Sequence, residues 1–128
     1  MNDGELFKMR KIIRLTLIKI GLRCDLIGFA YICTSIELAI LKPEMLNSLC
    51  KCLYTAVGQQ YTVSKIGTVE RNMRHAIENA FVSTSFSELN KIFKSDLFSE
   101  DEKPTVGELI KLMVQYYKLG LYKNYITI

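Results

Sequence analysis

The stretch Val69-Glu-Arg-Asn-Met-Arg-His-Ala-Ile-Glu-Asn-Ala-Phe81 decides the fold class, because its apolar residues recur with the period of an α-helix. The apolar positions 69, 73, 76, 77, 80 and 81 form one continuous stripe, and the polar and charged residues lie off this stripe. We therefore predict one amphipathic helix of about five turns. Ser64 is its expected N-cap, because a serine hydroxyl can accept a hydrogen bond from an amide of the first turn.

Three further helices are predicted on the N-terminal side of this stretch. Apolar residues recur with helical spacing over 6–20, and Gly21 is the expected end of that helix. A second helix is predicted over 26–41, because Pro43 disfavours helical backbone at the residue before it. The same period continues over 44–60, which predicts a third helix, and a turn over 61–64 then leads into the fourth.

Two capping boxes predict a fifth and a sixth helix on the C-terminal side. Both Ser85-Phe-Ser-Glu88 and Thr105-Val-Gly-Glu108 place a hydroxyl three residues before a carboxylate, so that each side chain can satisfy a backbone amide of the other residue. An acidic loop over 99–104 separates these helices, and no stretch shows a convincing strand pattern. We therefore predict the all-α class, as a six-helix bundle in which helices three and four form a helix-turn-helix.

The composition indicates one globular domain that spans residues 1–128. Hydrophobic residues make up 49% of the chain and charged residues 23%, and the formal net charge of +4 mildly favours an anionic partner. The longest uncharged run, 26–36, is about half of the ~20 residues that a membrane span requires. The charged N-terminal region also lacks the apolar core of a secretory signal. We expect a cytoplasmic protein that makes no contact with a membrane.

The four cysteines and the single histidine do not indicate a metal site or a catalytic site. Cys50 and Cys52 are two residues apart in a predicted helix and so point to different faces, and no C-x-x-C motif or second histidine accompanies them. We expect Cys24, Cys33, Cys50 and Cys52 to be buried free thiols. Neither a glycine-rich phosphate loop nor a nucleophile beside a base is recognisable, so we expect no enzyme and no cofactor.

The expected third helix, the turn and the fourth helix form the pattern of a helix-turn-helix, whose second helix lies in the major groove of DNA. The stretch 69–81 closely resembles the recognition helix of the stage-zero sporulation protein A family, which are response-regulator transcription factors of spore-forming bacteria. The resemblance covers roughly residues 12–119. It includes further landmarks of the family in the same order, namely Ile20-Gly-Leu, Gly28-Phe-Ala-Tyr31, Leu53-Tyr54 and Pro104-Thr-Val-Gly-Glu108.

The resemblance implies a DNA-binding effector domain that regulates transcription by binding short asymmetric boxes in double-stranded DNA, often as head-to-tail pairs. Further partners that it implies are a second copy of the chain on DNA, RNA polymerase or a related regulator, and the implied location is the bacterial nucleoid. Full-length members of the family carry an N-terminal receiver domain that is phosphorylated on aspartate, and nothing before Ile12 could be one. We therefore expect no receiver domain in 1–128, and control by phosphorylation is not carried over.

Four residues of the predicted recognition helix match the family's motif at positions that face DNA in the family, namely Glu70, Arg71, Arg74 and His75. Each has an alternative role. The two arginines contact a guanine edge or phosphates, or they are solvated on the helix surface. Glu70 accepts a hydrogen bond from a cytosine amino group, or it orients Arg74 through an i to i+4 pair. His75 contacts a phosphate, or it has an ordinary surface role.

Three more residues complete the predicted DNA-binding site. Ser64 and Lys65 lie at the start of the helix, where backbone amides and the positive helix end can bind phosphate, or where they are only a cap and a solvated cation. Thr68 stands where the family typically has an arginine that reads guanine. Because threonine offers only a short hydroxyl and a methyl group, we expect an altered or weakened base specificity. The turn over 62–65 is also one residue longer than is usual, and Thr55 replaces a proline that often follows the Leu-Tyr pair.

Two hypotheses of different classes remain. In the first, the chain binds double-stranded DNA through helix four, whereas in the second it is a protein-interaction module that pairs with or antagonises a related full-length regulator. A basic cluster in helix one contacts DNA backbone, an acidic partner or a membrane surface, or it is the solvated outer face of that helix, which we expect. The cluster consists of Lys8, Arg10, Lys11, Arg14 and Lys19.

Overall fold

The computed structural model describes residues 1–83 and 86–126, and all the regular structure within these ranges is helical. The all-α six-helix prediction is thereby confirmed. The six α-helices are α1 (Asp3–Lys19), α2 (Ile27–Leu41), α3 (Thr55–Gln60), α4 (Ile66–Ser83), α5 (Glu88–Phe93) and α6 (Val106–Lys118). Three short helical segments accompany them, namely η1 (Pro43–Asn47), η2 (Leu49–Tyr54) and η3 (Leu121–Asn124). None of the described helices is long and apolar enough to cross a membrane.

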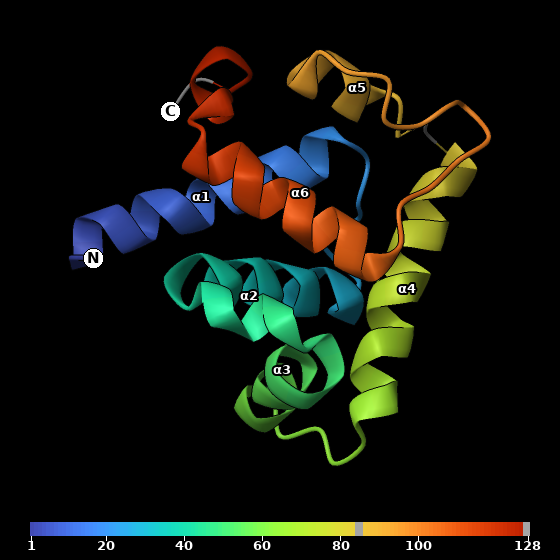
Figure 1. The fold of residues 1–128 in the computed structure, drawn as a ribbon. Helices are drawn as coiled ribbons and strands as arrows, with labels where there is room; N and C mark the ends of the chain where they lie inside the picture. Colours follow the sequence, from blue (N-terminus) through green and yellow to red (C-terminus); the bar gives the residue numbers. More distant parts are fainter. Residues whose placement is uncertain (84–85, 127–128) are drawn as a thin grey trace.

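Helix α2 is the centre of the bundle, and it contacts α1, α3, α4 and α6. Figure 1 shows α1 extending away on one side of α2, with α4 standing on the opposite side. A helix that is surrounded in this way must be apolar on all faces. Helix α2 meets this requirement, since most of it is buried and its few buried hydroxyls are hydrogen-bonded. One of them, Ser35 Oγ, donates to the carbonyl oxygen of Tyr31 at 2.7 Å.

Helices α2 and α4 meet backbone to backbone at Gly28. A Cβ atom at this position would lie 2.0 Å from the carbonyl oxygen of Asn72 and 3.1 Å from the Cβ of Ala76. Real Cβ atoms do not approach other atoms so closely, so only glycine fits there without moving the helices apart. The position of α4 is therefore fixed by contact with the backbone of the central helix.

The apolar stripe predicted from the sequence faces this contact. Val69, Met73, Ala76 and Ala80 are fully buried, and Ile77 is nearly so. Phe81, at the end of the stripe, is only half-buried, and its ring lies 5.6 Å from the ammonium group of Lys103. The amphipathic character of α4 is thus confirmed over almost its whole length.

The third predicted helix is not continuous, which corrects the expectation of one helix over 44–60. Ser48 has extended backbone (φ −148°, ψ 99°), so it interrupts the helical hydrogen bonds and divides the region into η1, η2 and α3. The middle segment has π-helical hydrogen bonding, and the Thr55 hydroxyl donates to the carbonyl oxygen of Cys50 at 2.8 Å. Leu53 and Tyr54 are buried by this arrangement. Only α3, a helix of six residues, directly precedes the turn into α4.

Several predicted helix ends are observed. Gly21 ends α1 with φ 111°, and the amide of Leu22 donates to the carbonyl oxygen of Leu17 at 3.0 Å, as in a Schellman motif. The capping box at α6 is also present, because Thr105 Oγ1 accepts from the Glu108 amide at 3.1 Å and a Glu108 carboxylate oxygen accepts from the Thr105 amide at 2.9 Å. Ser85, the hydroxyl of the other predicted box, lies outside the described residues.

The expectation of four buried cysteines is wrong for three of them. Only Cys33, in the central helix, is buried, and this burial raises the pKa of its thiol to about 12. Cys24 is exposed because it lies in the loop between α1 and α2. Cys50 and Cys52 are exposed in η2, where the buried residues come later in the segment. No group of three or more His, Cys, Asp or Glu side chains in the described part of the chain is placed to hold a metal ion.

Candidate nucleic-acid interface

The outer face of α4 is open to solvent. Arg71, Arg74 and His75 are all exposed, and Gly67 and Glu78 extend the exposed surface toward the two ends of the helix. The opposite face of the same helix packs directly against α2, so α4 cannot rotate to bury its polar face. In Figure 1, α4 stands at the edge of the bundle, with no other helix drawn over its outer side. The structure therefore leaves a face of the predicted recognition helix free to contact a partner.

Glu70 and Arg74 form an ion pair along this face. Nη1 of Arg74 lies 2.9 Å from Oε1 and 2.8 Å from Oε2 of Glu70, so one nitrogen donates to both carboxylate oxygens. An i to i+4 pair of this kind is worth a few tenths of a kcal/mol, because both side chains remain partly hydrated. In the isolated domain, Glu70 thus has the orienting geometry that is one of its two predicted roles.

Arg71 is held much less firmly than Arg74. Its only hydrogen bond within the described residues joins Nη2 to the Thr68 hydroxyl at 3.5 Å, which is long for a nitrogen to oxygen contact. Its guanidinium group therefore keeps nearly all of its donors available to a ligand. Thr68 itself is half-buried, and its carbonyl oxygen accepts from Asn72 Nδ2 at 2.8 Å.

Ser64 and Lys65 precede the first residue of α4 and are both exposed. The helix begins at Ile66, so Ser64 lies two residues before it, and within the described part of the chain its hydroxyl makes no hydrogen bond. The predicted capping by Ser64 is therefore not observed. The Lys65 carbonyl accepts from the Thr68 amide at 3.0 Å, which places Lys65 at the entrance to the first turn.

The turn between α3 and α4 contains a strained residue that the sequence analysis missed. Thr62 has φ 58°, in the left-handed region that β-branched residues rarely adopt. The amide of Val63 donates to the carbonyl oxygen of Gly58 at 2.8 Å and that of Thr62 to Gln59 at 3.3 Å. These two bonds define a Schellman motif, whose left-handed position is usually glycine. Threonine carries no sequence signal for this conformation, so the pattern of residues could not have revealed it.

Tyr54 lies beneath the start of α4 and lines a hollow of about 510 Å³ together with Ile66, Gly67 and Glu70. Burial, and secondarily the nearby Glu70 carboxylate, raise the pKa of this phenol to about 12. Tyr54 therefore remains a neutral, largely apolar support for the first turn at physiological pH. It is not one of the predicted site residues.

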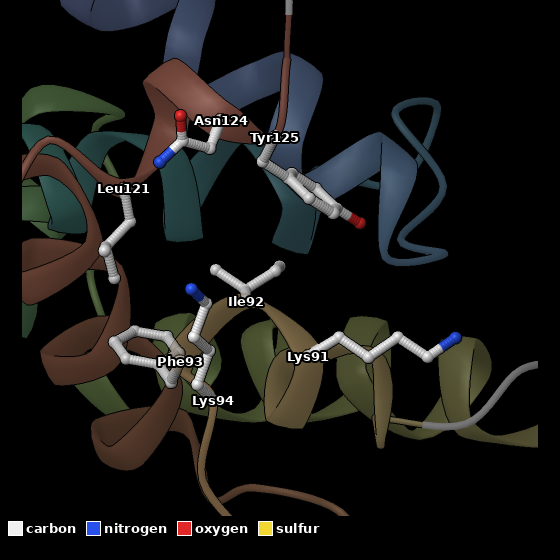
Figure 2. A pocket seen from close by; sticks show the side chains of 7 residues that line it. All are labelled: Lys91, Ile92, Phe93, Lys94, Leu121, Asn124 and Tyr125. Carbon is white, nitrogen blue, oxygen red and sulfur yellow. The ribbon is translucent and has the colours of Figure 1, made fainter.

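Another hollow, of about 370 Å³, lies between α5 and η3 (Figure 2). Figure 2 shows Ile92, Phe93 and Leu121 around its apolar part, and Lys94 and Asn124 bring polar atoms to it. Its lining has no carboxylate, imidazole or thiol, and its titratable side chains are those of Lys91, Lys94 and Tyr125. It contains none of the predicted site residues, which lie at the start and along the outer face of α4.

A family model described as the C-terminal domain of the sporulation initiation factor Spo0A matches residues 13–117 of the chain. The chain belongs to this family. The match covers all of α2, α3, α4 and α5, so it includes the recognition helix and its turn. The Spo0A C-terminal family is one of DNA-binding domains and not of enzymes, and it acts in the regulation of sporulation transcription. The chain is accordingly a DNA-binding effector domain of the sporulation-factor type, and its partner is DNA.

Proposed function

We propose that the domain regulates transcription by inserting the outer face of α4 into the major groove of double-stranded DNA. The observation that carries this proposal is the division of α4 into a buried stripe fixed on α2 and an exposed face with Arg71, Arg74 and His75. A recognition helix needs both properties, because it must be held rigidly while its polar side chains reach base edges.

The exposed side chains divide by the contacts that suit them. Arg71, with its donors available, reads a base edge, since a bidentate arginine to guanine contact discriminates by about 1–3 kcal/mol. Glu70 orients Arg74, and either Arg74 or Glu70 reaches the base edges in the major groove of DNA. Ser64 and Lys65 contact phosphate at the start of the helix, and His75 does so along its outer face.

Thr68 weakens or changes the specificity of this interface. It is half-buried and carries only a hydroxyl, to which Arg71 approaches at 3.5 Å. A threonine cannot make the bidentate contact that the arginine typical of the family makes with guanine. The preferred box should therefore differ from the family's box at the base pair that this position faces.

A titration of labelled duplexes tests the proposal. The duplexes carry the family's box, a scrambled box, or two head-to-tail boxes, and each is measured at low and at moderate salt. We expect binding at low salt that weakens steeply as salt rises, because phosphate contacts release counterions. Two-box duplexes also show whether two copies bind together. Absence of binding to every duplex at low salt would reject the proposal.

A second candidate function is that of a protein-interaction module that pairs with a related full-length regulator or with RNA polymerase. Thr68 in place of an arginine favours it, as does the engagement of Arg74 with Glu70. A pull-down with a purified full-length member of the family separates the two candidates when it is run beside the duplex titration. Binding to duplex without binding to the regulator supports the DNA-reading function.

A further inference from the structure

We propose that a groove between α1, α2 and the end of α3 binds a protein partner through a short amphipathic helix that is acidic along its flanks. The groove has a volume of about 690 Å³. It is separate from the face of α4 proposed to read DNA, and the inference does not depend on that function. The partner is identified by this chemistry alone.

Exposed apolar side chains gather along one wall of the groove. Phe7 is 69% exposed, Leu15 38% and Ile18 45%, and all three lie on α1 and line the groove. Phe7 and Ile18 are separated by about 16 Å along the helix axis, or three turns. Large apolar side chains that are exposed together, and not scattered singly, mark an interaction surface. An occupant with apolar residues on one face over about three turns would cover them.

The charges around the groove select an acidic occupant. Arg10 is paired with Glu37, through an Nη2 to Oε1 distance of 2.7 Å, and Glu37 is the only carboxylate in the lining. Lys11 and Arg14 line the groove as well and make no hydrogen bond or ion pair within the described residues. Once the pair has neutralised itself, two cations remain beside the apolar wall. Aspartate or glutamate flanking an apolar face would complement them.

The opposite wall is preformed. Tyr61, which follows α3, lines the groove, and its hydroxyl lies 2.8 Å from the Thr34 hydroxyl on α2. Its ring packs edge to face on that of Tyr31, with 5.0 Å between the ring centres. Because this wall is held by the bundle, the site is a concave groove and not only the ridge of one helix. A helix can insert into a concave groove more readily than a flat bilayer surface can. The apolar wall of the groove would find no apolar surface to pack against on a DNA backbone.

The apolar wall of the groove lies away from α4. Figure 1 shows α1 and α4 on opposite sides of α2. The other end of the groove, at Gln60 and Tyr61, adjoins the turn that leads into α4.

A display library of 16-residue helical peptides tests the proposal on the full chain. Peptides are selected on the wild-type protein and counter-selected on the Phe7→Ser, Lys11→Glu double variant. We expect the enriched peptides to carry apolar residues at helical spacing with aspartate or glutamate beside them. The binding of one enriched peptide is then measured by fluorescence polarisation, and its site is mapped by amide chemical shifts.

The Lys11→Glu, Arg14→Glu variant should weaken that peptide at least tenfold, and so should Phe7→Ser alone. The Lys118→Glu, Lys123→Glu variant is the matched control, because it makes the same total change of charge at two exposed lysines outside the groove and should change the affinity less than twofold. Thermal unfolding of each variant shows that it is folded. Enrichment of basic peptides, no enrichment that depends on Phe7 and Lys11, or shifts confined to other helices would overturn the proposal. Binding to anionic phospholipid vesicles but to no peptide would overturn it in favour of a membrane surface.

Discussion

The two faces of α4 are governed by different physics, although they belong to one helix of 18 residues. On the inner face, the backbone at Asn72 approaches Gly28 so closely that no Cβ fits between them. On the outer face, Arg71 and His75 are exposed, and the ion pair of Glu70 and Arg74 lies on the surface. Changes on the inner face should therefore alter stability, whereas changes on the outer face should alter binding and leave the fold intact.

The largest effect is expected from Gly28→Ala, which changes the close contact on the buried inner face of α4. The added methyl group would overlap the Asn72 carbonyl, so the two helices must separate, and we expect a loss of about 3 kcal/mol in the free energy of unfolding. Urea unfolding measures it. Gly67→Ala is the matched control on α4, where an added Cβ meets no atom within 4 Å, and it should instead stabilise by about 0.5–1 kcal/mol. Equal stability of the two variants would contradict the close crossing.

The next effect concerns binding alone. Arg71→Ala should weaken duplex binding by about 1–3 kcal/mol and leave the free energy of unfolding within about 0.5 kcal/mol, because Arg71 is exposed and weakly bonded. Duplex titration and urea unfolding are run on the same preparation. If the side chain reads a base, the loss is confined to the preferred box, whereas a phosphate contact weakens all sequences alike. No change on any duplex would make Arg71 a bystander.

A smaller effect is expected at the turn that joins α3 to α4. Thr62→Gly should stabilise the domain by about 1 kcal/mol, since glycine removes the strain of a β-branched residue at φ 58° but raises the entropy of the unfolded chain. The reverse change, Gly21→Thr, introduces the same strain into the same motif at the end of α1 and should destabilise. Thermal unfolding compares the two. A loss of stability in Thr62→Gly would show that the threonine side chain is needed in the turn.

The smallest effect on stability is expected on the exposed outer face of α4. Glu70→Gln removes the charge from the ion pair with Arg74 and should cost only a few tenths of a kcal/mol of stability. The difference from wild type should shrink at high salt, because the pair is partly exposed. Unfolding at two salt concentrations measures it. A cost of several kcal/mol would mean that the pair acts as a buried interaction.

Local patterns predicted much of this molecule. The stripe over 69–81, the end of α1 at Gly21 and the capping box of Thr105 depend on residues that are near one another in the sequence, and all three are observed. The exposed face of α4 follows from the same periodicity, since whatever lies off a buried stripe points outward. The contacts of its seven site residues with DNA remain predictions.

What the sequence did not reveal depends on long-range packing or on unusual backbone. The role of Gly28 arises from contact with Asn72, which is 44 positions away in the chain. The break at Ser48 has no proline or glycine to mark it. Asn90 binds the loop after α5 by accepting from the amides of Leu97 and Phe98, at 2.8 and 2.9 Å. An asparagine in a helix does not indicate such a distant partner.

The contact at Gly28 holds α4 rigidly against α2. Two helices that pack through long side chains can slide or roll slightly as rotamers change. At Gly28 the two backbones are in direct contact, so no side chain between them can adjust in this way. If α4 enters the groove as proposed, the domain cannot tilt it to suit an imperfect operator. The adjustment would then fall on the duplex, so that operators rich in pliable pyrimidine–purine steps would tolerate mismatches that rigid tracts would not.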